Sequence, residues 1–359
     1  MKALQLVEVG KPMEINEVPT PVIRTDDRRD DNQVIVRVKA CGLCGTDLHH
    51  VKGTAKVSRL PMILGHEISG VVEEVGETVP AGRLFAPTVQ QGDRVNVNNV
   101  IFCGECVPCR RGKYNFCENQ LMFGRQVDGG LAEFVKVPAR NLIRLPDEID
   151  FSVGAILGCA AVTAFHAVRL GDLAASDAVV VWGVGGVGLS LILLAREVSG
   201  AYPIIAVGRR TKPLKLAKEI GADFSINVRE EDPVERILDL TEGVGADAVY
   251  DTAGITETDE KGTVITLKAL GPGGRLIVVA TYGDTINLEP HDELGVFEKS
   301  FTGSCGNVPR DLHDLVKLVA GRNLNFRRLI AKEIVLEQVN DVLLDWLEHG
   351  GMTRAVVTF

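Results

Sequence analysis

A glycine-rich turn between a buried strand and a helix constrains the fold more than any other part of the sequence. The strand D-A-V-V-V-W ends at residue 182, G-V-G-G-V-G follows, and the apolar helical sequence L-S-L-I-L-L comes next. This order is typical of a dinucleotide-binding unit, because glycines let the backbone approach a pyrophosphate and the helix start offers it free N–H groups. We therefore predict a cofactor contact at Gly183, Gly185, Gly186, Val187 and Gly188.

The surrounding sequence alternates strands and helices. After the glycine turn come a strand P-I-I-A-V-G, a helix K-P-L-K-L-A-K-E-I and further strands A-D-A-V-Y-D and R-L-I-V-V-A. Such alternation builds a parallel sheet with helices on both faces. The first 150 residues instead hold short β-like runs separated by Gly, Pro and Asp, and the chain closes on a strand R-A-V-V-T-F. We predict an α/β protein with a β-rich part and a doubly wound parallel sheet.

The end of the second strand of this sheet bears on the choice of cofactor. An acidic residue there would bind the ribose 2′-hydroxyl of NAD(H) and repel a 2′-phosphate. The sequence has Gly208 at this point, followed by Arg209 and Arg210. A missing carboxylate and two added guanidinium groups favour a phosphorylated ribose. We therefore predict NADP(H) in preference to NAD(H).

Composition limits the class of partner and directs attention to the cysteines. The formal net charge of −9 and an aromatic content of 5% argue against binding to nucleic acid. We find no secretion signal and no apolar run of membrane-spanning length, and so expect a cytoplasmic protein with no membrane partner. In that setting the clusters among the 8 cysteines are better explained as metal ligands than as disulfides.

The first cysteine cluster is local and has the spacing C-x2-C-x2-C-x7-C. Four thiolates so close together can complete a tetrahedral shell around zinc and leave no position open for a substrate, which predicts a structural zinc site. An iron–sulfur cluster and a redox-active set of thiols are the alternatives, because spacing alone does not exclude them. The residues are Cys103, Cys106, Cys109 and Cys117.

The second cluster is dispersed over three short motifs. C-G-L-C-G-T-D-L-H-H starts at residue 41, G-H-E occupies 65–67, and G-C occupies 158–159. Thiol and imidazole groups drawn from three segments suit a catalytic zinc that keeps its fourth position open. Cys41 and Cys44 both fit this pattern, so the motif by itself does not decide which thiol is the ligand.

Together these motifs resemble the medium-chain zinc-dependent alcohol dehydrogenase family. The motif G-H-E, the four-cysteine segment, the later G-C, the turn G-x-G-G-x-G and the terminal R-x-x-x-T-F occur in the family's order along nearly the whole chain. The resemblance implies a β-rich catalytic domain formed by residues 1–155, with a structural-zinc lobe at about 100–120, and by residues 305–359. It implies a Rossmann-type dinucleotide-binding domain, residues 156–304, inserted between them.

The resemblance also assigns residues to the catalytic zinc. It makes Cys44, His66 and Cys159 the ligands, which selects Cys44 over Cys41 because the family's ligand directly precedes G-T-D. It places Glu67 beside the metal, able to exchange onto it. In total it implies two zinc ions per chain, one catalytic and one structural.

Further family positions concern proton transfer and the cofactor. Asp47 matches a carboxylate that orients the ligand imidazole, and Thr46 and His49 match a relay that carries the alcohol proton away through the nicotinamide ribose. His50, the neighbour of His49, is expected to face solvent. Thr163 and Arg354 match positions that contact the nicotinamide and the pyrophosphate.

The resulting prediction is an NAD(P)-dependent alcohol dehydrogenase that oxidises an alcohol reversibly to an aldehyde or ketone, as a homodimer or homotetramer. An NAD-dependent polyol, sugar or hydroxyacyl-type dehydrogenase of the same family is the alternative, although Cys159 stands where polyol-type relatives have a carboxylate. A zinc-free reductase should lack the ligand set, and a zinc-ribbon binding module should lack the dinucleotide motif.

Overall fold

The protein is described here by a computed structural model that covers residues 1–23, 32–76, 88–254, 265–280, 290–349 and 354–359. Its internal contacts divide the chain into two compact units. Unit 1 comprises Met1–Val162 and Asn307–Phe359, and unit 2 comprises Thr163–Gly306. The boundaries expected from sequence were 155/156 and 304/305; the first falls inside helix α3 (Phe151–Ile156), which packs on strands of unit 1.

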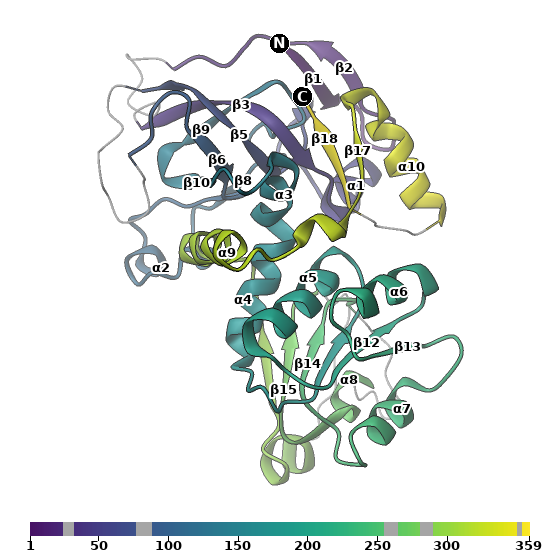
Figure 1. Cartoon of the computed structure of the whole chain (residues 1–359). Coiled ribbons are helices and arrows are strands. Elements are labelled where there is room, and N and C mark those ends of the chain that lie inside the picture. Colours follow the sequence, from purple (N-terminus) through teal and green to yellow (C-terminus); the bar gives the residue numbers. More distant parts are fainter. Residues whose placement is uncertain (24–31, 77–87, 255–264, 281–289, 350–353) are drawn as a thin grey trace. The chain divides into compact units, whose positions relative to one another are not determined.

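Unit 1 is built on sheets whose strand pairs are antiparallel except for β17 with β18 (Figure 1). In its described part, a 7-stranded sheet has the order β10-β6-β5-β3-β18-β17, and β9 also pairs with β3. A smaller sheet has the order β2-β1-β4, and β7 pairs with β8. The bounds are β1 Lys2–Leu6, β2 Glu14–Glu17, β3 Gln33–Gly42, β4 Met62–Ile63, β5 Glu67–Val75, β6 Arg94–Val97, β7 Val100–Ile101, β8 Leu121–Met122, β9 Phe134–Pro138, β10 Leu142–Arg144, β17 Ile330–Ile334 and β18 Arg354–Thr358.

The last strand of the chain completes the large sheet of unit 1. β18 is antiparallel to β3, with Val357 opposite Cys41 and Val356 opposite Gly42, and parallel to β17. This pairing brings the start of β18 to the end of β3, where the first cysteine motif begins. The helices of unit 1 are α1 Gly45–Lys52, α2 Val107–Arg110, α3, α9 Pro309–Arg322 and α10 Val339–His349.

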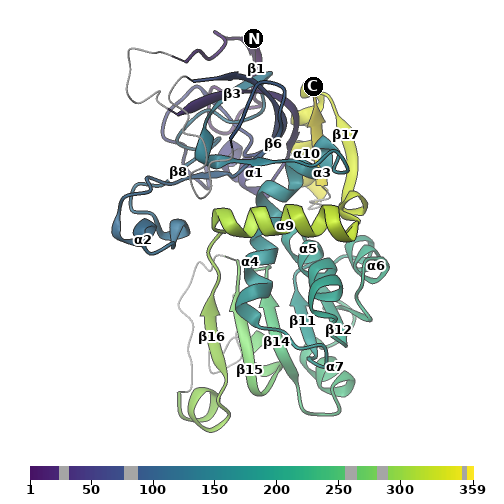
Figure 2. The same ribbon diagram turned by 60° about the vertical axis from the view of Figure 1, so that its left-hand side comes forward.

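Unit 2 is a parallel sheet covered by helices. The 6 strands in the described part of this unit have the order β13-β12-β11-β14-β15-β16, all parallel, with β16 at one edge (Figure 2). The strand order reverses at β11, which is where doubly wound sheets bind dinucleotides. The bounds are β11 Val179–Trp182, β12 Ile204–Gly208, β13 Phe224–Asn227, β14 Ala246–Asp251, β15 Leu270–Val278 and β16 Ser300–Gly303.

Helices cover both faces of this sheet, which confirms the predicted α/β fold class. Ile237 of α7 and Leu267 of α8 join one apolar core with alternate strand residues such as Val249. The neighbouring Tyr250 points to the opposite face and meets Gly171 at the end of α4. The helices are α4 Val162–Gly171, α5 Gly186–Leu194, α6 Thr211–Glu219, α7 Pro233–Leu240 and α8 Ile265–Lys268.

One long helical stretch is rich in apolar residues. Residues Phe151–Gly171 are long and apolar enough to cross a membrane by length and composition, although no apolar run of that length was expected. The stretch is 78% buried inside the protein, so its apolar side chains are used by the protein core. Small residues such as glycine and alanine in this stretch are common where a helix packs closely inside a fold.

Candidate active site

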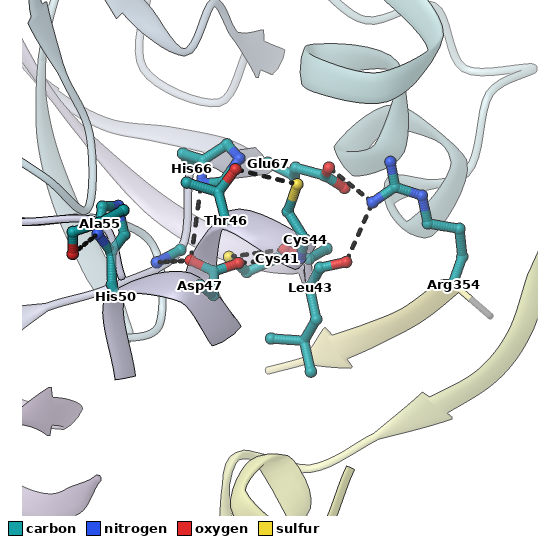
Figure 3. Close-up of polar contacts among 12 residues, drawn as sticks. Cys41, Leu43, Cys44, Thr46, Asp47, His50, Ala55, His66, Glu67 and Arg354 are labelled. Atoms are coloured by element: carbon teal, nitrogen blue, oxygen red, sulfur yellow. Dashed lines mark hydrogen bonds and ion pairs between the residues drawn. The ribbon is translucent and has the colours of Figure 1, made fainter. Parts of the chain in front are cut away.

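Helix α1 begins at the first cysteine motif and is fixed there by Asp47. One carboxylate oxygen of Asp47 accepts the backbone N–H of Cys44 at 2.9 Å, which caps the helix. The other accepts the backbone N–H of Gly65 at 3.2 Å and lies 3.6 Å from Nδ1 of His66. A single buried carboxylate thus ties the Cys44 segment to the Gly65–His66 segment and orients the imidazole (Figure 3).

His66 and Glu67 stand at the start of β5, opposite the end of β3. Glu67 pairs in register with Gly42, and a Cβ at Gly42 would come within 2.3 Å of Oε2 of Glu67. A glycine is therefore required there to leave room for the carboxylate. Both side chains are buried, His66 at 1% exposure and Glu67 at 0%.

Arg354, the first residue of β18, closes this side of the site. Its Nη1 donates to Oε1 of Glu67 at 2.7 Å and to the carbonyl of Leu43 at 3.0 Å (Figure 3). Burial raises the pKa of Glu67 to about 7, although the guanidinium of Arg354 opposes that shift. The Glu67–Arg354 ion pair was not expected from sequence, which had assigned Arg354 only to the pyrophosphate.

Cys159 lies on a π-helical turn, Leu157–Ala161, between α3 and α4. Its thiol joins Cys44, His66 and Glu67 in a group whose ligand atoms all lie within 4.8 Å of one another. A hydrogen bond with Cys159 helps to hold the pKa of Cys44 well below its ordinary value. π-helical turns inside helices are frequent at functional sites.

This donor set fits a zinc ion. Nε2 of His66 and Oε2 of Glu67 are both buried without a hydrogen-bond partner in the described structure. Buried polar atoms without a partner are energetically costly unless a bound ligand or ion interacts with them. Ligands at zinc distances lie on the order of 3.5 Å apart in a tetrahedral shell, and two thiolates with one imidazole suit zinc.

The structure also shows where Cys41 and His50, two residues near the ligand group, lie. Cys41 is fully buried beside Gly65 and is not part of the four-ligand group. His50 was expected to face solvent, and this was wrong: it is 2% exposed, and its Nδ1 donates to the carbonyl of Ala55 at 3.1 Å. Its position follows from helix geometry, because residues three apart share a face and Asp47 is buried on that face.

The two expected relay residues lie on another face of α1. Thr46 and His49 are also three positions apart, so their side chains are neighbours along the helix. The thiol of Cys44 lies 3.7 Å from Oγ1 of Thr46. His49 is exposed, and its Nδ1 lies 2.8 Å from Oγ1 of Thr54.

The four-cysteine motif forms a second compact group of thiols around the short helix α2. All four sulfur atoms lie within 4.8 Å of one another, and the Cys103–Cys109 and Cys106–Cys117 sulfur separations are 4.0 and 3.9 Å. These separations are about twice a disulfide bond length, so the thiols are not paired as disulfides. Thiols this close suit one tetrahedral ion better than a cluster of several irons.

In unit 2 the glycine turn has the tight packing expected of a dinucleotide motif. α5 begins at Gly186, with Gly185 as its N-cap. Gly183 has φ +103°, and a Cβ at Gly188 would lie 1.8 Å from the carbonyl oxygen of Gly183. The hydroxyl of Thr252 donates to that same carbonyl at 2.8 Å, which holds the turn from the neighbouring strand β14.

The residues after β12 form a positively charged group. A Cβ at Gly208 would come within 2.6 Å of the side chain of Val184, so the fold leaves no room there for an acidic side chain. Nη1 of Arg210 is buried without a hydrogen-bond partner. Burial, together with the charges of Arg209 and Arg229, lowers the pKa of Arg210. Arg229, which follows β13, was not singled out from sequence.

Comparison with known proteins identifies the family of the chain. Residues 30–147 match the family model described as alcohol dehydrogenase GroES-like domain, and residues 186–321 match the one described as zinc-binding dehydrogenase. An NAD-dependent alcohol dehydrogenase of Sulfurisphaera tokodaii is 33% identical over 359 residues, covering 97% of this chain and 97% of the relative. The chain belongs to the medium-chain zinc-dependent alcohol dehydrogenase family.

Other members of the family show its range. An L-threonine 3-dehydrogenase of Bacillus subtilis is 35% identical over 286 residues, covering 78% of this chain and 76% of the relative. A zinc-binding dehydrogenase of Sinorhizobium meliloti, solved with NADP bound, matches with a TM-score of 0.86 and 29% identity over 100% of this chain and 99% of that chain. The protein is therefore an NAD(P)-dependent alcohol dehydrogenase; one relative is named as NAD-dependent and another was solved with NADP bound.

Proposed function

We propose that this enzyme oxidises an alcohol reversibly at a zinc site formed by Cys44, His66 and Cys159. The observation that carries the proposal is the convergence of these side chains with Glu67 in a group of buried and half-buried residues, where two ligand atoms have no hydrogen-bond partner among the described residues. A zinc ion held there would act as a Lewis acid that lowers the pKa of the alcohol. Cys103, Cys106, Cys109 and Cys117 would hold a second, structural zinc.

The remaining residues of the site orient groups and move a proton. Asp47 holds His66 and the start of α1 in place through three contacts. The hydroxyl of Thr46 lies next to Cys44. In the proposed relay it accepts the proton of the substrate hydroxyl while it releases its own proton, through the nicotinamide ribose hydroxyl, toward His49. His49, the next residue on that face of α1, passes the proton to solvent.

Besides Asp47, the site contains the carboxylate of Glu67, which is paired with Arg354 and could exchange onto a bound zinc ion. While Arg354 holds Oε1, Oε2 of Glu67 remains free to approach the metal. We also propose that the guanidinium of Arg354 contacts the cofactor pyrophosphate, as predicted from the sequence. Thr163, half-buried near the start of α4, keeps its assignment to the nicotinamide.

For the cofactor we propose NADP(H) in preference to NAD(H). Three arginines lie around the end of β12 and one guanidinium nitrogen is buried without a partner, which suits a phosphate group. The space beside Gly208 is taken by Val184, so position 208 offers no carboxylate to a ribose hydroxyl. The relatives named for NAD weigh against this choice, and the arginine group is the reason for keeping it.

Metal analysis combined with a substrate panel tests the proposed reaction. We expect two zinc ions per chain and turnover of some alcohols with their aldehydes or ketones. Cys44→Ser and His66→Ala should each lose one zinc and reduce kcat by at least about 10³-fold while the protein stays folded. Near-normal turnover in both variants would refute the site.

A second experiment tests the cofactor. Arg210→Ala should weaken NADP(H) binding by about tenfold and leave NAD(H) binding unchanged, because it removes a charge-assisted hydrogen bond to the 2′-phosphate. Arg236→Ala is a matched control, since this exposed arginine on α7 pairs with Glu231 and Asp239. An unchanged ratio of the two affinities in Arg210→Ala, or a wild-type preference for NAD of tenfold or more, would exclude the NADP assignment.

Oxidation of a 3-hydroxy amino acid is the second candidate reaction. The threonine dehydrogenase of Bacillus subtilis is 35% identical over 286 residues, so such a substrate belongs in the panel beside polyols and simple alcohols. Turnover of a 3-hydroxy amino acid well above that of every simple alcohol would favour this candidate.

For location and assembly, we propose that the enzyme is a cytoplasmic homodimer or homotetramer.

A further inference from the structure

The turn after α1 brings a threonine hydroxyl onto the side chain of His49. Gly53 ends the helix in the left-handed conformation with φ +76°, and its N–H binds the carbonyl of His50. The chain then folds back, and the N–H of Ala55 donates to the carbonyl of His49 at 3.1 Å. Glycine at this position is the usual end of a helix, and the reversal places Thr54 against His49.

Thr54 makes two contacts with the same histidine. Its Oγ1 lies 2.8 Å from Nδ1 of His49 and 3.3 Å from the carbonyl oxygen of His49. A hydroxyl has one hydrogen to donate and two lone pairs to accept with. If the hydroxyl donates to the carbonyl and accepts from Nδ1, both contacts are hydrogen bonds. If it donates to Nδ1, its oxygen faces the carbonyl oxygen without a hydrogen between them.

We propose that Thr54 is a positioning residue that holds neutral His49 in its Nδ1–H tautomer and so makes Nε2 the proton-accepting atom of the relay. This inference rests on the proposed relay role of His49. The Nδ1–H···Oγ1 hydrogen bond is the same whether Nε2 carries a proton or not. The ring therefore keeps its orientation while a proton arrives at and leaves Nε2, and no group has to reorganise between the two states.

His50 provides an internal reference for this tautomer. Its Nδ1 lies 3.1 Å from the carbonyl of Ala55, and a carbonyl can only accept. Neutral His50 must therefore carry its hydrogen on Nδ1. The tautomer of His49 depends instead on a hydroxyl, which can donate or accept, and so responds to a change at residue 54.

The direct test is nitrogen NMR of the 7 histidines in the zinc-loaded enzyme, at a pH where the rings are neutral. His49→Gln assigns the His49 signals by their loss. We expect the wild type and Thr54→Ser to show a protonated Nδ1 and a bare Nε2 at His49, matching His50. In Thr54→Val we expect His49 to shift toward the Nε2–H tautomer and His50 to remain unchanged.

Turnover shows whether the tautomer matters for the reaction. Thr54→Val should lower kcat by about tenfold with little change in KM, whereas Thr54→Ser should stay within about twofold of the wild type. In a His49→Gln background Thr54→Val should have no further effect, because Thr54 acts through His49. An additional loss of the same size in that background would assign Thr54 a separate role and overturn the proposal.

Three other results separate this inference from the relay itself. A wild-type His49 protonated on Nε2, or a tautomer unchanged in Thr54→Val, overturns the role of Thr54 while leaving the relay intact. Normal turnover in His49→Gln would contradict the relay role of His49, and Thr54 would then have no effect on kcat through it. The nitrogen signals would then still show whether Thr54 sets the tautomer.

Discussion

Tyr250, at the residue scale, carries a polar group that the fold leaves without a partner. It lies in the middle of the sheet of unit 2 at 0% exposure, and its hydroxyl has no hydrogen-bond partner in the described structure. The hydroxyl abuts Gly171, where an added Cβ would lie only 1.8 Å away. Burial raises the pKa of Tyr250 well above 10. An unsatisfied buried hydroxyl costs more than it contributes.

We therefore expect Tyr250→Phe to raise the free energy of unfolding by about 1 kcal/mol and Tm by about 2–4 °C.

The raised pKa of Tyr250 also predicts that the stability of the wild type depends on pH. The unfolded tyrosine ionises near pH 10 and the folded one at higher pH, so wild-type stability should fall as pH rises above 10. Denaturant unfolding at pH 7 and above pH 10 measures both effects. A less stable Tyr250→Phe would show that a bound water satisfies the hydroxyl.

Sequence reasoning reached ligand types but not the contacts between distant residues. Thiol and imidazole groups beside glycines indicated metal chemistry, and the resemblance to the family then selected Cys44, His66 and Cys159 as the predicted ligands. The ion pair of Glu67 with Arg354 joins residues 287 positions apart and depends on how β18 pairs with β3. Nothing in the local sequence indicates such a pairing, so this contact could be known only from the structure.

At the scale of elements, two glycines of the glycine-rich turn are predicted to serve different purposes: Gly188 allows close packing of the fold, and Gly185 allows the cofactor to bind. Gly188→Ala would place a Cβ 1.8 Å from a backbone carbonyl, so we expect a loss of about 2 kcal/mol in unfolding free energy together with weaker cofactor binding. A Cβ at Gly185 meets nothing within 4 Å. Gly185→Ala should therefore keep its Tm and still bind the cofactor more weakly, because the pyrophosphate approaches this glycine.

Thermal unfolding and cofactor titration of both variants measure the difference. Equal losses of Tm in Gly188→Ala and Gly185→Ala would contradict the assignment of Gly188 to packing. Unchanged cofactor affinity in Gly185→Ala would contradict the assignment of Gly185 to the pyrophosphate.

Helix α1 carries its two pairs of polar residues on different faces. Asp47 and His50 are three positions apart, as are Thr46 and His49, so the two pairs occupy different faces. An assigned inward role for Asp47 already implied that His50 would be buried. The exposed contact between His49 and Thr54 depends on the reversal after Gly53 and could not be read from helix periodicity.

At the scale of the whole molecule, the class of fold followed from periodicity, while the limits of the units did not. Strand–helix alternation after residue 177 predicted the parallel sheet of unit 2, and its central strands β11 and β12 are the continuous apolar runs that such sheets contain. The helical stretch Phe151–Gly171 runs through the boundary between residues 162 and 163. Because the chain changes unit inside a helix, no turn signal marks that boundary in the sequence.

The two cysteine sites predict different consequences for the whole chain when one ligand is removed. Cys44→Ser and Cys109→Ser should each reduce the zinc content from about two ions per chain to about one, because a tetrahedral site loses most of its affinity with a missing thiolate. Cys44→Ser should abolish turnover with a small change in Tm. Cys109→Ser should lower Tm by several degrees, because the local segment around α2 has few apolar residues to hold it without an ion.

Metal analysis, calorimetry and turnover of the two variants distinguish these outcomes. A wild-type content of one zinc per chain would leave one of the groups of ligands without an ion. Equal loss of turnover with unchanged Tm in both variants would mean that the four-cysteine site takes part in the reaction. A stable, active Cys109→Ser protein with one zinc would mean that the folded segment of 103–117 does not need its ion, and that its thiols are held by the fold itself.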